Sequence, residues 1–245
     1  MTKGNITKTL LLFSLPMIAG NLLQQFYNIA DTLIVGRFLG RDALAAVGSA
    51  YTLMTFLTSI LLGMSMGAGA LFAIYQGQGN TERLKASMVQ AFGLILALTA
   101  ALYGIVYGFI DPIMGFLRVP DEVYGLMREY LWIIFAGLAA TFLYNFFSST
   151  LRALGDSYTS FLAITVSALV NVVMDVILVA GFGMGVRGAA IATTASQVLA
   201  ALICLVKISR YPVFHIRRKY LRPDGLLLKE DICICIPMMA QSIVI

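Results

Sequence analysis

Residues 86–110 read ASMVQAFGLILALTAALYGIVYGFI, a run of 25 residues without a charged side chain. A helix of about 20 apolar residues crosses the hydrocarbon core of a bilayer, which is about 30 Å thick. This stretch therefore predicts a transmembrane helix. Working outward along the chain, five further stretches of at least 18 residues also lack charge: 9–30, 43–81, 130–151, 157–174 and 188–206.

The longest stretch, 43–81, predicts one span at about 46–74 followed by a polar end. The chain is thus predicted to be an all-α integral membrane protein with a bundle of six transmembrane helices. Its composition agrees, because 60% of residues are hydrophobic, 12% are charged and the mean hydropathy is +0.88. A soluble domain of this size could not bury so much apolar surface. Three Cys are too few for a disulfide scaffold.

The end of the chain resembles its beginning. Residues 227–245, LLKEDICICIPMMAQSIVI, and residues 6–24, ITKTLLLFSLPMIAGNLLQ, share a lysine, a proline, a methionine and an alanine at matching positions. Six spans return the chain to its starting side, so both copies would enter the membrane in the same direction. The repeat predicts a two-lobed, twelve-helix protein with parallel halves. Its predicted parts here are an amino-terminal six-helix lobe (1–208), a basic cytoplasmic loop (209–228) and the start of a seventh helix (229–245).

The Lys and Arg residues predict the orientation of this bundle. With the amino terminus in the cytoplasm, most of the 17 Lys and Arg residues lie on the cytoplasmic side, as the positive-inside rule requires. We therefore expect a multi-pass protein of the cell (inner or cytoplasmic) membrane with a cytoplasmic amino terminus. The net charge of +5 follows from this bias and requires no nucleic-acid partner.

Two carboxylates fall inside predicted spans. Asp31 is followed by Thr32–Val35 and Asp175 by Val176–Ala180, and no Lys or Arg accompanies either at that depth. A charged residue at the centre of a span costs about 2.5–3.5 kcal/mol on insertion scales, and such residues are usually functional. The pair predicts a site that binds a proton, a metal cation or a cationic substrate, or that faces water.

Other polar side chains share the helix faces of these carboxylates. Asn171 lies one turn before Asp175, and their oxygen atoms could together hold a cation or share a proton. The candidates for a substrate cavity are Gln24, Tyr27, Asn28, Ser167 and Gln197. The alternative is interhelical hydrogen bonding, worth about 0.6–2 kcal/mol each. For Ser167, Thr193 and Gln197 this alternative is at least equally good.

Two features bear on helix packing and bending. Pro16 removes a backbone hydrogen bond about four turns before Asp31 and predicts either a static kink or a hinge in the first helix. The pattern Gly63-xxx-Gly67 favours close approach of a neighbouring helix.

The chain resembles the MATE (multidrug and toxic compound extrusion) family, in its DinF-like prokaryotic branch. The resemblance rests on motifs in the family's order along essentially the whole chain. These are Leu15-Pro16-Met17, Gln24-Gln25, Asn28-Ile29-Ala30-Asp31-Thr32, Val35-Gly36-Arg37-Phe38-Leu39-Gly40, Ala43-Leu44-Ala45-Ala46-Val47-Gly48, Arg152-Ala153-Leu154-Gly155-Asp156-Ser157, Asn171-x-x-x-Asp175 and Gly188-Ala189-Ala190-Ile191-Ala192-Thr193.

The resemblance implies an antiporter, not an enzyme, that exports cationic lipophilic compounds in exchange for H⁺ or Na⁺ and needs no cofactor. It implies partners of three kinds: a small cationic substrate, the lipid bilayer and a carboxy-terminal lobe of the same polypeptide. The residues it places at a cation site, with Na⁺ as the metal it could hold, are Asp31, Asn171, Asp175 and Thr193. It also links Pro16 to bending of the first helix.

Two other functions fit six helices. A flippase for lipid-linked saccharides would need basic residues in its cavity to meet the pyrophosphate, whereas the predicted spans contain acids and no bases. An intramembrane aspartyl protease would use two aspartates, but Ala30-Asp31-Thr32 and Met174-Asp175-Val176 differ from the usual contexts of that class. The sequence pattern is compatible with either H⁺ or Na⁺ as the coupling ion.

Overall fold

The computed structural model describes residues 6–214, 220 and 224–244. Within these residues the chain is helical and contains no strand, which confirms the all-α class. The elements, in chain order, are α1 (Ile6–Leu39), α2 (Arg41–Gly77), α3 (Thr81–Phe116), α4 (Asp121–Ala136), α5 (Leu138–Ala153), α6 (Ser157–Asp175), η1 (Val176–Gly181), α7 (Gly185–Ile208), η2 (Pro212–Phe214) and α8 (Gly225–Val244).

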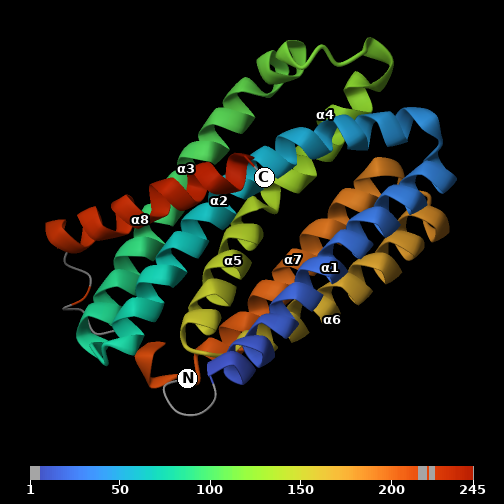
Figure 1. Cartoon of the computed structure of the whole chain (residues 1–245). Helices are drawn as coiled ribbons and strands as arrows, with labels where there is room; N and C mark the ends of the chain where they lie inside the picture. Colours follow the sequence, from blue (N-terminus) through green and yellow to red (C-terminus); the bar gives the residue numbers. More distant parts are fainter. Residues whose placement is uncertain (1–5, 215–219, 221–223, 245) are drawn as a thin grey trace.

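The helices run up and down through one bundle (Figure 1). The α1–α2, α3–α4 and η1–α7 connections lie at one end, and the α2–α3 and α5–α6 connections lie at the other (Figure 1). Helices α1, α6 and α7 pack together, α2 packs with α3 and α8, and α5 contacts both α2 and α7. This alternation agrees with the six predicted crossings.

Among the described residues, four helices are long and apolar enough to cross a membrane: α2, α3, α6 with η1, and α7. The bent pair α4–α5 makes a fifth candidate span. Helix α1 is not among these candidates, but its 34 residues are long enough to cross, at about 1.5 Å per residue.

The fourth predicted span differs from the expectation of one helix over 130–151. It begins earlier, at Asp121, and bends by 42° at Gly137 between α4 and α5. A Cβ atom at Gly137 would lie 2.8 Å from Oγ1 of Thr194 on α7. The bend thus occurs where glycine allows α7 to approach the backbone closely.

The fifth predicted span runs through Asp175, as expected. Helix α6 ends at this residue, and the chain continues as a π-helix over Val176–Gly181. A π-helix is rare and frequently marks a functional site, because its wider turn changes the direction of nearby side chains. The predicted site residue therefore lies at a local change in helix geometry.

Helix α8 packs tightly against α2. A Cβ atom at Gly63 would lie 2.5 Å from Cα of Met239, and one at Gly67 would lie 2.6 Å from Cα of Cys235. The predicted close approach at these glycines is confirmed. Helix α8 begins at Gly225, inside the predicted 209–228 loop, whose residues 215–219 and 221–223 lie outside the described part of the chain. The domain boundaries remain a prediction.

Candidate cation site and cleft

The two intramembrane carboxylates lie near each other. Helix α1 packs on α6 and η1, and this packing brings the carboxylates of Asp31 and Asp175 within range of electrostatic interaction. Asp175 and Asn171 are completely buried, whereas Asp31 is partly exposed. The structure thus unites two aspartates that are far apart in the sequence.

Several oxygen atoms at this site have no hydrogen-bond partner. They are Oδ1 of Asp31, Oδ1 of Asn171 and both carboxylate oxygens of Asp175. In the part of the chain that the structure describes, neither aspartate forms an ion pair with Lys or Arg. Two close carboxylates without a cation repel each other, so the arrangement favours a bound proton or a hard cation with oxygen ligands.

Thr193 fixes the orientation of Asn171. The Asn171 amide Nδ2 donates to Oγ1 of Thr193 across the α6–α7 contact, at 3.5 Å. Because the amide nitrogen is used in this contact, the amide oxygen remains available as an acceptor toward a cation or a protonated carboxyl. The structure therefore brings together the four residues predicted for the cation site, while their role as ligands stays a prediction.

A cleft lined by both polar and apolar side chains lies beside the carboxylates. A cavity of about 590 Å³ is lined by Asp31 and Tyr130, and a neighbouring cavity of about 440 Å³ is lined by Gln24 and Gln197. The residues that line both cavities are Gln25, Tyr27, Asn28, Tyr51, Met54 and Thr193. We call the two cavities together the cleft. The lining that the described part of the chain provides contains Asp31 and no Lys or Arg.

The predicted cavity residues fall into two groups. Gln24, Tyr27, Asn28 and Gln197 line the cleft, and Tyr27 interacts with both glutamines. Ser167 is not among the cleft-lining residues that the structure describes. Its hydroxyl donates to the Ser196 carbonyl at 2.6 Å, which is the interhelical hydrogen bond considered as its alternative role.

Tyr130 is a site residue that sequence reasoning missed. It is buried on α4, lines the cleft and lies near both Asp31 and Asp175. Its hydroxyl is suited to hydrogen-bond a carboxylate or a bound ion. No periodic polar pattern on α4 singles it out, because its role depends on how α4 is rotated against α1.

Arg152 directly follows the predicted span 130–151. It lies in the last turn of α5, where its guanidinium donates to Oγ of Ser148 and Ser149, both at 2.8 Å. It also lines a small cavity of about 50 Å³ with Pro16 and other α1 residues. The site of Pro16 is therefore next to an arginine, although α1 continues through the proline without a break.

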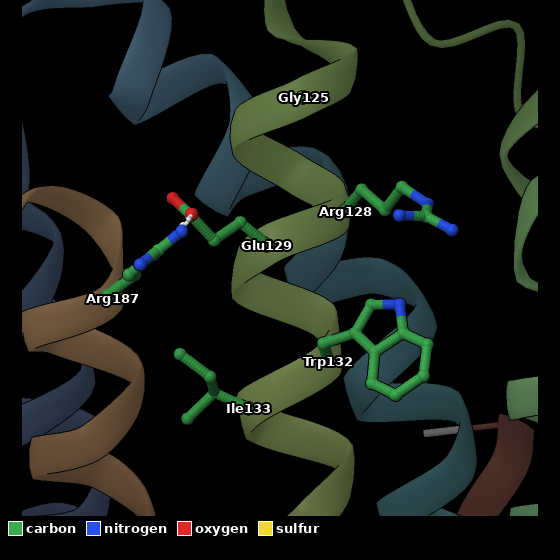
Figure 2. A pocket seen from close by; sticks show the side chains of 6 residues that line it. All are labelled: Gly125, Arg128, Glu129, Trp132, Ile133 and Arg187. Atoms are coloured by element: carbon green, nitrogen blue, oxygen red, sulfur yellow. Dashed lines mark hydrogen bonds and ion pairs between the residues drawn. The ribbon is translucent and has the colours of Figure 1, made fainter.

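A third hollow, of about 550 Å³, lies between α4 and α7 (Figure 2). Arg187 extends from α7 to form an ion pair with Glu129 on α4, while Arg128 points away from that pair (Figure 2). Arg128 instead pairs with Asp111 on α3, at 3.0 Å. Because each arginine has an acidic partner, the hollow joins helices and carries no unpaired charge for a ligand.

A multi-pass helical protein with a buried acidic pair beside a cleft of mixed polar and apolar lining fits the class of membrane transport proteins. Such a site serves the passage of ions and solutes, as intramembrane carboxylates commonly do. The chain belongs to the MatE family, whose profile matches residues 16–177. Members of this family are secondary transporters, not enzymes.

Relatives and solved structures agree with this membership. The chain is 32% identical to "Probable multidrug resistance protein YpnP" of Bacillus subtilis, covering 97% of this chain and 54% of that protein. It is 29% identical to "Multidrug export protein MepA" of Staphylococcus aureus, covering 98% and 54%. The chain thus spans about half the length of the curated relatives it matches.

The fold is similar to transporters solved in two conformations. An outward-facing multidrug resistance MATE family transporter of the MOP superfamily matches with a TM-score of 0.89 and 26% identity, covering 98% of this chain and 53% of that one. An inward-facing structure matches with a TM-score of 0.83 and 26% identity, covering 90% and 50%. These similarities confirm the amino-terminal half of a two-lobed transporter fold.

Proposed function

We propose that this chain is the amino-terminal lobe of a multidrug efflux antiporter in the cytoplasmic membrane. It exports cationic lipophilic compounds in exchange for H⁺ or Na⁺, and Asp31, Asn171, Asp175 and Thr193 form the cation site. The carboxy-terminal lobe of the same polypeptide completes the transport path. The names of the relatives, which describe multidrug resistance and export, support this proposal.

One observation carries the proposal. Asp31 and Asp175 interact within the bundle, four oxygen atoms around them lack partners, and the described residues supply no Lys or Arg to either. Such a pair needs a mobile positive species to neutralise it. Asp31 also lines the cleft, so the neutralising species reaches the pair from the same space that a substrate would occupy.

The exchange follows from competition for this negative charge. In the outward-facing state, a proton or Na⁺ binds to the carboxylate pair and removes its attraction for a cationic substrate. Neutralisation also changes the hydrogen bonds among Asp31, Asn171 and Thr193, and α1 repacks as the substrate leaves. Coupling requires that ion and substrate bind the alternating states with different affinities.

The flippase alternative has less support. Recognition of a pyrophosphate group needs arginine or lysine in the cavity, whereas the described residues that line the cleft include Asp31 and no Lys or Arg. Arg152 is a basic candidate close by, because it lines the small cavity beside Pro16, which shares Gln24 and Tyr144 with the cleft. A cationic substrate is therefore the better match to the cleft.

The test is transport by the full reading frame that encodes this chain, reconstituted in liposomes. Uptake of a fluorescent lipophilic cation is measured under an imposed H⁺ or Na⁺ gradient. Asp31→Asn and Asp175→Asn should each abolish gradient-driven transport, because each removes one of the charges that ion and substrate share. The matched control, Asp111→Asn, changes an exposed aspartate outside the cleft and should retain activity.

The two gradients identify the coupling ion. Transport driven by a pH gradient in Na⁺-free buffer indicates H⁺, and transport that requires a Na⁺ gradient indicates Na⁺. Full export by Asp31→Asn or by Asp175→Asn against a substrate gradient would contradict the proposal.

A further inference from the structure

A third buried carboxylate lies outside the cleft, on α8. The Asp231 side chain is completely inaccessible where α8 packs against α2 and α3. Its Oδ1 accepts a hydrogen bond from Oγ of Ser87 on α3 at 3.0 Å, while its Oδ2 has no hydrogen-bond partner among the residues that the structure describes. An ionised carboxylate is unfavourable in this position, because burial removes the hydrogen bonds of Oδ2 to water and the described residues supply no replacement.

The adjacent residue, Glu230, has the opposite environment. Its carboxylate accepts a hydrogen bond from the hydroxyl of Tyr75 on α2 and lies 4.0 Å from the guanidinium of Arg83 on α3. Glu230 is also partly exposed to solvent. Arg83 therefore compensates the negative charge of Glu230, whereas the hydrogen-bond partner of Asp231 is the uncharged Ser87 hydroxyl.

Burial and the negative charge of the adjacent Glu230 favour a neutral Asp231. Within α8, Glu230 and Cys235 act on it, and both would add negative character if ionised. The other ionisable residues on this part of the three helices are Tyr75 on α2, Glu82, Arg83 and Lys85 on α3, and Lys229 on α8. Ser87 on α3 contacts the Asp231 carboxylate through its hydroxyl.

We propose that Asp231 is a proton-binding site of the α2–α3–α8 joint, separate from the Asp31–Asp175 site. The bound species is a proton, because Asp231 and Ser87 supply too few oxygen ligands for a metal ion, which takes about six. One proton from water converts the carboxylate to a neutral carboxyl while α8 is packed, and the same proton returns to water when the joint opens.

The tightness of the joint makes protonation and packing depend on each other. The α8 backbone at Cys235 fits against Gly67 with no room for an added Cβ, and the Cys235 thiol donates to the Met64 carbonyl at 3.4 Å. Water can solvate an ionised Asp231 only if α8 moves away from α2 and α3. Loss of the proton should therefore expose Cys235.

The thiol of Cys235 reports this movement directly. In the full-length protein, Cys204→Ala and Cys233→Ala remove the other two cysteines of this chain, so that Cys235 is the thiol followed by alkylation. The rate of Cys235 alkylation is measured at a series of pH values around neutrality. Thiol ionisation raises this rate at high pH in any variant, so each rate is divided by that of Asp231→Asn at the same pH. We expect this ratio to rise by about tenfold with pH, the effect of leaving a buried polar group unsatisfied.

Two controls separate this site from others. Glu230→Gln should leave the pH dependence of the ratio in place, and the double variant Asp31→Asn/Asp175→Asn should also leave it in place. Infrared spectra recorded at mildly acidic pH should show a protonated-carboxyl band that Asp231→Asn removes. A ratio that stays constant with pH, or a band unaffected by Asp231→Asn, would overturn the proposal. Neither readout requires transport, so failure here leaves the antiport proposal to its own test.

Discussion

At the residue scale, Asn171 offers a test of the proposed cation site. Its amide nitrogen is bound to Thr193, and its buried oxygen faces no protein donor. We expect Asn171→Ala to raise the coupling-ion concentration for half-maximal transport by about tenfold, because one ligand or hydrogen bond is lost. The maximal rate should change little, because Asp31 and Asp175 remain.

The measurement is transport rate against H⁺ or Na⁺ concentration. Thr193→Val is the matched variant, since it keeps the Asn171 oxygen and removes only the hydroxyl that orients it. Thr193→Val should raise the coupling-ion concentration for half-maximal transport less than Asn171→Ala does. An unchanged ion dependence in Asn171→Ala would remove Asn171 from the site.

Asp156 provides a pH-dependent stability prediction outside the membrane spans. Burial raises the pKa of Asp156, but hydrogen bonds from the Thr159 backbone and hydroxyl and the charge of Lys207 lower it, so that the net pKa lies below its usual range. The carboxylate caps α6 through the Thr159 N–H at 2.9 Å and lies 3.6 Å from Lys207 Nζ.

A lowered pKa in the folded state means that Asp156 stabilises the fold above its unfolded pKa of about 3.9 and loses this effect as pH falls through the folded value. At pH 7, Asp156→Ala should lower the free energy of unfolding by about 1 kcal/mol, because the cap is lost. Asp156→Asn should cost less, because asparagine also caps helices. Thermal unfolding in detergent at pH 7 and below pH 4 checks this, and a difference that grows on acidification would contradict it.

At the element scale, the α2–α8 contact depends on the absence of side chains. A Cβ at Gly67 would lie 2.6 Å from Cα of Cys235, which is backbone and cannot rotate away. Gly67→Ala should therefore destabilise the packed state by about 1–3 kcal/mol, as overpacking does. Gly93→Ala on α3 is the matched control, because no atom lies within 4 Å of its added Cβ.

Thermal unfolding and Cys235 alkylation both follow this contact. Gly67→Ala should lower the midpoint of unfolding and speed up alkylation, and Gly93→Ala should leave both near the wild-type values. Equal behaviour of the two variants would show that α8 does not need close approach to α2.

At the scale of the whole molecule, Pro16 tests whether α1 is a hinge. Helix α1 is continuous from Ile6 to Leu39, so the structure contains no break at the proline. Pro16→Ala restores one backbone hydrogen bond and should stiffen α1. If bending of α1 accompanies exchange, this variant should transport more slowly, with unchanged or higher thermal stability.

Distances between spin labels at the two ends of α1 provide the structural readout. The wild-type protein should show two distance populations whose ratio responds to H⁺ or Na⁺, and Pro16→Ala should show mainly one. Identical distributions in both proteins would make Pro16 a static feature of the helix.

The sequence was sufficient for the membrane class and for the residues most expensive to bury. Transfer into lipid is a property of each short segment, so the charge-free stretch 86–110 predicts a span without knowledge of its neighbours. The same reasoning found Asp31 and Asp175, because an aspartate in an apolar run is conspicuous wherever the run packs.

Only the tertiary structure decided which faces meet. Three features depend on how the helices rotate about their axes and approach one another. They are the proximity of Asp31 to Asp175, the position of Tyr130 near both, and the burial of Asp231 against Ser87. Hydropathy along the chain is nearly unchanged by such rotations, whereas packing between distant helices changes strongly. Segment chemistry thus determined that the chain enters the membrane and carries acids there, and helix packing determined which acids share a site.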